Sequence, residues 1–200
     1  MIETSTADRT ISSVIATIRM RTRDLHVQLE SRFDARQAFA SRETYVELLR
    51  RYLGVFRPLE RSMDGLPGWM QERLSWPERR KMVLLERDLA QMGARSTAED
   101  APGMPCIADM DAALGVLYVV EGSCLGGQYL YRDLNARLGL DATSGASFLK
   151  GYGETTGSMW KAFLELLERE VRDAGSAADT ACDLFRFFET SLEVKHDRER

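Results

Sequence analysis

The sequence predicts an all-α fold, a single-domain bundle of six to eight helices spanning residues 1–200. Apolar residues recur at steps of three and four along most of the chain, and no segment shows the alternation of a half-buried strand. Segments rich in capping residues, glycine and proline separate these periodic stretches. A chain of this length can bury a sizeable core. The polar residues 1–10 are expected to be disordered.

The first two periodic stretches predict amphipathic helices at about 11–31 and 42–63, and Ser41 is placed to cap the second. Pro58 is expected to bend or end that second helix, because proline lacks the backbone N–H and clashes with the preceding turn.

The middle of the chain predicts one more helix followed by a loop. Ser75 and Glu78 form a capping-box pattern, which should open a helix that Gly93 can stop. Residues 93–108 contain two prolines and a glycine within four positions, and they predict a loop.

The last part of the chain predicts a long helix from a cap at Asp109 to about residue 138. A short helix is expected near Phe148. Apolar residues across 159–171 predict another helix, and Ser176 with Asp179 is expected to cap the last one.

Charge and composition limit the classes of partner. The net charge is −4 and the pI about 5.4, which gives no basic footprint for nucleic acid. The longest apolar run, 112–120, is too short to cross a bilayer, so no membrane partner is expected. The N-terminus lacks a secretory pattern, and three widely spaced cysteines show no metal-site spacing. These features favour a reduced, cytoplasmic setting.

The long helix carries an unusual stripe of glycine. At about 100° per residue, Gly115, Gly122 and Gly126 lie nearly on one line, bordered by Ser123 and Gly127. Each interior glycine costs a helix about 1 kcal/mol relative to alanine, which suggests a purpose. The stripe fits either close packing of another helix or a groove for a flat ligand. The adjacent pair 126–127 favours the groove, because paired glycines also ease kinking.

Two histidines are candidate metal ligands. His26 shares one side of the first helix with Arg19, Thr22 and Arg23, so it is either a metal ligand beside an anion site or a solvated residue at the helix margin. His196 has the Glu-x-x-His spacing of helical iron sites, but in one copy near the charged C-terminus. Cys124 lies in an apolar helix and is expected to be a packed, unreactive thiol.

Two segments together resemble the heme oxygenase family. Residues 21–30, Arg-Thr-Arg-Asp-Leu-His-Val-Gln-Leu-Glu, resemble the family's proximal-helix motif. Residues 117–128, Leu-Tyr-Val-Val-Glu-Gly-Ser-Cys-Leu-Gly-Gly-Gln, resemble the distal-helix motif of its bacterial branch. The length and the all-helical pattern are also similar, so the resemblance covers most of the chain.

The resemblance implies a heme held between these two helices, with His26 as the axial iron ligand. The residues implied on the opposite, catalytic face are Gly122, Ser123, Gly126 and Gly127. The implied heme-binding set is Arg19, Thr22, Arg23, Tyr118 and Lys161, with Arg19 and Lys161 pairing with the propionates. One departure concerns Ser123, because many family members have an aspartate there that orders distal waters.

The implied activity is oxidative cleavage of heme by O₂ and reducing electrons to biliverdin, CO and iron. Heme is then both substrate and cofactor, and an electron-donating reductase or ferredoxin is the implied partner. Two other interpretations stay open: a heme carrier or sensor without turnover, and a thiaminase-type enzyme on the same helical fold. The latter requires a pocket nucleophile and carboxylates in place of iron.

Overall fold

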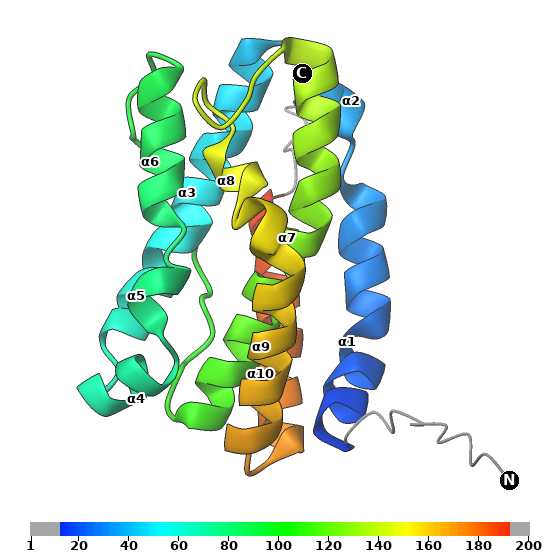
Figure 1. The fold of residues 1–200 in the computed structure, drawn as a ribbon, viewed down its shortest axis with the longest axis vertical. Coiled ribbons are helices and arrows are strands. Elements are labelled where there is room, and N and C mark those ends of the chain that lie inside the picture. Colours follow the sequence, from blue (N-terminus) through cyan, green and yellow to red (C-terminus); the bar gives the residue numbers. More distant parts are fainter. Residues whose placement is uncertain (1–12, 193–200) are drawn as a thin grey trace, which may run out of the picture.

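The computed structural model describes residues 13–192, and every regular element in that range is helical (Figure 1). The longer helices are α1 (Ser13–Arg32), α3 (Arg42–Asp64), α6 (Met82–Gln91), α7 (Met110–Leu138), α9 (Thr156–Glu170) and α10 (Ala174–Leu192). The short elements are α2 (Ala35–Ala38), α4 (Gly68–Arg73), α5 (Trp76–Arg79), α8 (Ser147–Lys150) and the 3₁₀ helix η1 (Gly153–Thr155). The all-α prediction is confirmed. The expectation for residues 1–10, and the candidates Glu193 and His196, lie outside the described residues.

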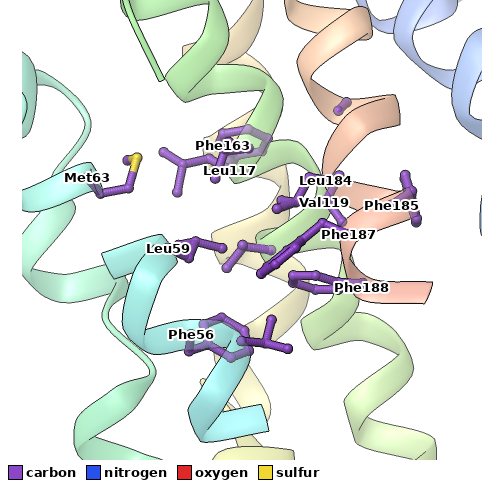
Figure 2. Close-up of a cluster of buried hydrophobic side chains, with 14 of the residues drawn as sticks. Phe56, Leu59, Met63, Leu117, Val119, Phe163, Leu184, Phe185, Phe187 and Phe188 are labelled. Carbon is purple, nitrogen blue, oxygen red and sulfur yellow. The ribbon is translucent and has the colours of Figure 1, made fainter. Parts of the chain in front are cut away.

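Helix α10 forms the centre of the bundle because it packs along both α1 and α7. Figure 2 shows Val119 of α7 beside Leu184 and Phe187 of α10, Leu117 of α7 beside Phe163 of α9, and Phe56 of α3 in the same buried cluster. Apolar burial of this kind is the main source of helix stability in a bundle. Helix α10 therefore sets where α1 and α7 lie relative to each other.

The expectation that Pro58 bends or ends its helix is wrong as to the end, because α3 continues to Asp64. Proline removes one N–H from the helix ladder, which leaves the carbonyl of Gly54 without its usual partner. The N–H of Ala101 donates to that carbonyl at 2.9 Å, so the loop before α7 supplies the missing hydrogen bond. A Cβ on residue 54 would lie 2.4 Å from the Glu99 carbonyl oxygen, so this close approach requires glycine.

The prediction of a single helix from Ser75 to Gly93 is also wrong, because the helical conformation is interrupted between α5 and α6. Ser75 has φ 49° and makes no side-chain cap. The carboxylate of Glu60 on α3 accepts the backbone N–H groups of Lys81 and Met82 at 2.6 and 2.8 Å. A distant side chain thus caps the start of α6, which the local pattern did not reveal.

Predicted ends near α7 are confirmed. The Asp109 carboxylate accepts the Ala112 N–H at 2.9 Å, and Gly139 has the left-handed φ of 66° that ends the helix. The short helix near Phe148 is α8. The predicted cap at Ser176 is wrong: α10 begins at Ala174, and the Asp173 carboxylate accepts the first-turn N–H groups.

Within residues 13–192, none of the helices combines the length and the apolar character needed to cross a bilayer.

Candidate functional site

His26 lies exposed at the margin of α1, with 54% of its side chain accessible. Its Nδ1 is 3.5 Å from a carboxylate oxygen of Glu30, one turn later on the same helix. Its ring meets the ring of Phe185 on α10 edge-on, at a centroid distance of 5.8 Å and an angle of 83°. Glu30 and Phe185 together orient the imidazole, which leaves Nε2 as the nitrogen available to a metal.

The other α1 candidates divide into two groups. Arg19 and Arg23 are both exposed on α1. Thr22 is buried, and its hydroxyl donates to the Ile18 carbonyl at 2.8 Å. The same helix exposes two large apolar side chains, Met20 at 73% and Val27 at 56%. A helix that exposes both kinds of side chain around His26 can accept an apolar ligand that carries anionic groups.

The glycines of α7 serve two different purposes. A Cβ on Gly115 would lie 2.2 Å from the Ala177 carbonyl oxygen, so this glycine allows α10 to pack closely. A Cβ on Gly127 would lie 3.0 Å from the Leu149 carbonyl oxygen of α8. A Cβ on Gly126 would meet nothing within 4 Å, and residue 126 is exposed. The stripe is therefore a packing surface at Gly115 and bare, accessible backbone at Gly126.

Ser123 and an aromatic row complete this part of α7. Ser123 is exposed, and its hydroxyl donates to the Val120 carbonyl at 2.7 Å, which leaves the oxygen lone pairs available. The Trp160 ring of α9 lies 3.7 Å from a Cβ built on Gly122 and 5.6 Å from the Tyr118 ring. Lys161, the next residue, is exposed and lies 3.8 Å from Glu165.

Residues 122–127, the glycine segment, have apolar neighbours on the surface. Leu125 is 37% exposed and Tyr129 is 73% exposed, on the same helix as Gly126. Two helices, α1 and α7, thus each present large exposed apolar side chains beside their candidate residues. Large exposed apolar groups gather in this way mainly where a ligand or partner covers them.

The structure adds a buried polar cluster that the sequence analysis did not single out. Glu121 of α7 is 1% exposed, and its Oε1 lies 3.2 Å from Nη1 of Arg79 on α5. The Tyr152 hydroxyl donates to the same oxygen at 2.9 Å, and burial raises the pKa of that hydroxyl. The sequence signal was a single glutamate directly after the apolar run 112–120. Its partners lie too far along the chain to be inferred from spacing.

Cys124 fits the prediction of a packed thiol. It is partly buried, its Sγ contacts the Val120 carbonyl at 3.5 Å, and burial raises its thiol pKa. A thiol held protonated in this way is a poor nucleophile. The thiaminase-type interpretation therefore gains no support at this position.

Helix α10 holds both candidate faces. Arg21 of α1 pairs with Asp179 and donates to the Gly175 carbonyl, and the Cys182 thiol contacts the Arg21 carbonyl. Figure 2 shows Phe185 projecting from the opposite side of α10 to Phe187. The ring under His26 and the contacts with α7 therefore come from one rigid helix, whose position fixes the separation of the two faces.

Comparisons with known proteins agree on one family. The heme oxygenase profile matches residues 12–193. A heme oxygenase of Xanthomonas campestris pv. campestris (strain 8004) is 30% identical over 167 residues, covering 80% of this chain and 94% of the relative. Heme oxygenase PigA of Pseudomonas aeruginosa is 28% identical over 184 residues, covering 88% and 89%.

A solved structure gives an independent match to the fold. The NO- and CO-bound heme oxygenase from Neisseria meningitidis aligns with a TM-score of 0.75 at 21% identity. The alignment covers 90% of this chain and 89% of that chain.

Proposed function

The chain belongs to the heme oxygenase family, and on that premise we propose that His26 ligates the heme iron while the glycine segment faces the opposite side of the ring. The activity is that of the family: heme is cleaved by O₂ and reducing electrons to biliverdin, CO and iron. Heme carries this oxidative chemistry when bound, and the protein supplies position and electrostatics.

The observation that carries the assignment of His26 is its exposed, oriented imidazole. Among residues 13–192 it is the single histidine. Its Nδ1 faces Glu30 and its ring rests on Phe185, so Nε2 is free to bind iron without disturbing the helix. A neutral imidazole is also a milder donor to iron than a thiolate.

The glycine segment suits the other side of a flat, apolar ring. With no neighbour within 4 Å of a Cβ on Gly126, backbone there can approach a ligand without a side chain between them. We propose that Gly122, Ser123, Gly126 and Gly127 form this face. In this arrangement the Ser123 hydroxyl supplies the polar group, because its lone pairs are available to order water or oxygen.

The propionates are assigned to basic residues at the rim. Arg19 and Arg23 are exposed on the His26 helix, and Lys161 lies beside Trp160 with only a weak contact to Glu165. An exposed pair of this kind contributes little, so a propionate can replace Glu165 at low cost. We assign Tyr118 to the aromatic wall and Thr22 to support of α1 from the core side, since its hydroxyl is already bonded.

The electrons must come from outside the chain. We propose that a reductase or ferredoxin delivers them in the cytoplasm. The support is the family reaction, which needs reducing electrons, and the sequence, whose three cysteines show no disulfide framework.

Substitution of the two histidines tests the assignment. His26→Ala is expected to keep the helical fold and to capture heme through apolar contact, but without a protein imidazole on the iron. Bilin formation should collapse, and added imidazole should restore part of it. His196→Ala is the matched control and should behave as the unsubstituted protein.

The measurements are the spectrum of the ferrous–CO complex and the bilin yield with a reductase or ascorbate in air. An imidazole-ligated spectrum in His26→Ala would refute the ligand assignment. A Soret band that stays intact in the unsubstituted protein would refute turnover and leave a carrier.

A further inference from the structure

The buried carboxylate of Glu121 lies immediately before the glycine segment, on the opposite side of α7 from Ser123. At 100° per residue, positions 121 and 123 lie about 160° apart around the helix. A charge this deeply buried is costly unless it is paired, and Arg79 at 3.2 Å supplies the opposite charge. Glu121 therefore faces the protein interior while Ser123 faces outward.

The partners of Glu121 tie three separate segments together. Arg79 belongs to α5 and donates through Nε to the Leu74 carbonyl at 2.7 Å, so a hydrogen bond and the ion pair with Glu121 together hold its guanidinium. Tyr152 precedes η1, and the Lys81 ammonium lies 4.0 Å from the centre of its ring. The Tyr152 hydroxyl donates to Glu121 at 2.9 Å, so the carboxylate joins α7 both to α5 and to the residue before η1.

A second polar anchor lies two turns along the same side of α7. The Gln128 side chain donates to the Lys150 carbonyl at 2.6 Å and to the Thr156 hydroxyl at 3.3 Å. Positions 121 and 128 share one side of the helix, since seven residues make nearly two turns. The two anchors thus bracket the glycine segment, and both attach it to residues 150–156.

The glycine segment, which lies between these two anchors, has the weakest helix propensity in α7. Three glycines within residues 122–127 weaken the helix, and adjacent glycines are common at kinks. A displacement there would move Ser123 and Gly126 together. Anchors from behind can fix such a segment without placing any side chain on its open face.

We propose that Glu121 is a positioning residue for heme cleavage: through Arg79 and Tyr152 it holds the glycine segment at the height over the heme that the reaction requires. The inference rests on the proposed placement of Ser123 and Gly126 over the ring. Glu121 itself touches neither heme nor oxygen. Its second oxygen, Oε2, has no hydrogen-bond partner among the described residues, so the contacts of Oε1 carry the attachment.

Two conservative variants test the proposal on the full-length protein loaded with heme. Tyr152→Phe removes one hydroxyl, and Glu121→Gln keeps an acceptor for Tyr152 but removes the charge that Arg79 pairs with. Tyr45→Phe is the matched control, because it deletes another buried hydroxyl, one that donates to the Gly145 carbonyl at 2.9 Å. The melting temperature of each variant is measured alongside to separate stability from position.

Three readouts are compared: the single-turnover rate of bilin formation, the acid–alkaline midpoint of the ferric heme complex, and amide hydrogen exchange of residues 122–127 in heme-free protein. Both test variants should keep heme affinity, exchange faster in the glycine segment and shift the midpoint. Their rate should fall about tenfold or more, because misplacement by about 1 Å can cost on the order of a hundredfold. Tyr45→Phe should change none of the three.

The proposal is overturned if exchange and midpoint stay at their original values in both test variants, whatever the rate does. It is also overturned if Tyr45→Phe shows the same changes, because the effect is then general loss of stability. If the unsubstituted protein forms no bilin, the proposed function fails instead, and amide exchange still decides whether Glu121 fixes the segment.

Discussion

Replacing two glycines of the same helix with alanine should change the free energy of unfolding in opposite directions. Alanine is better than glycine inside a helix by about 1 kcal/mol. At Gly126 a Cβ meets nothing within 4 Å, so Gly126→Ala should collect most of that gain and stabilise the protein by about 0.5–1 kcal/mol.

At Gly115 the same methyl group meets three backbone atoms of Ala177, at 2.2, 3.1 and 3.3 Å. Backbone cannot rotate aside as a side chain can, so α7 and α10 must separate by roughly 1 Å. Overpacking of a tight core costs about 1–3 kcal/mol, and more when neighbouring helices must move. Because this cost exceeds the gain in helix propensity, Gly115→Ala should destabilise the protein by about 1–2 kcal/mol.

Urea unfolding followed by circular dichroism gives both values from the shift of the midpoint at constant slope. The two variants carry the same chemical change in the same helix, so each is the control for the other. A Gly115→Ala protein as stable as the original would refute the packing assignment. A destabilised Gly126→Ala protein would show that residue 126 is not open.

Three further predictions follow from the site and its supports. Gly126→Leu should keep normal helix content, because leucine is a good helix former, but it should lose bilin formation. Circular dichroism and bilin yield measure the two effects, and a normal bilin yield would show that residue 126 does not face the heme. Arg19→Glu should weaken heme binding or change the biliverdin isomer, because it replaces attraction for a propionate with repulsion. Hemin titration measures the affinity and chromatography identifies the isomer; if neither changes, Arg19 does not bind a propionate. Asp88 of α6 is buried and accepts the backbone N–H groups of Ser147 and Phe148 at 2.8 and 2.7 Å, and this burial raises the pKa of its carboxyl above the ordinary 3.8. Just above pH 3.8 the folded protein therefore holds a proton that the unfolded chain has released, so the free energy of unfolding should fall as pH rises through that window. Asp88→Asn should make the urea midpoint less dependent on pH in this window. If the midpoint of the variant depends on pH as strongly as that of the original protein, another group causes the pH dependence.

Features whose partners are close in sequence could be predicted. Asp109 and Gly139 were identified as the ends of α7 because each acts on backbone within a few residues of itself. The start of α6 was missed because its cap, Glu60, lies 21 residues away from Lys81. A local pattern contains no information about a carboxylate delivered by another helix.

The candidate site divides in the same way. His26 and the glycine segment were found from two motifs, each contained in one helix. Phe185 under the imidazole, and Tyr152 behind Glu121 at a separation of 31 residues, depend on how helices pack. The spacing of Gly115, Gly122 and Gly126 also could not distinguish packing from open backbone, because that depends on whether α10 lies over the residue.

Pro58 has a consequence for the long loop between α6 and α7. The proline leaves the Gly54 carbonyl open to the Ala101 N–H, and the missing side chain of Gly54 lets the loop approach. The loop is thereby connected to a helix more than forty positions earlier and contributes to that helix's hydrogen bonding. A residue other than proline at position 58 would bring its own N–H to compete for the same carbonyl. Substitutions at Pro58, at Gly54 and around Ala101 should therefore co-vary among related sequences. The loop should also tolerate insertions less well than its exposure suggests.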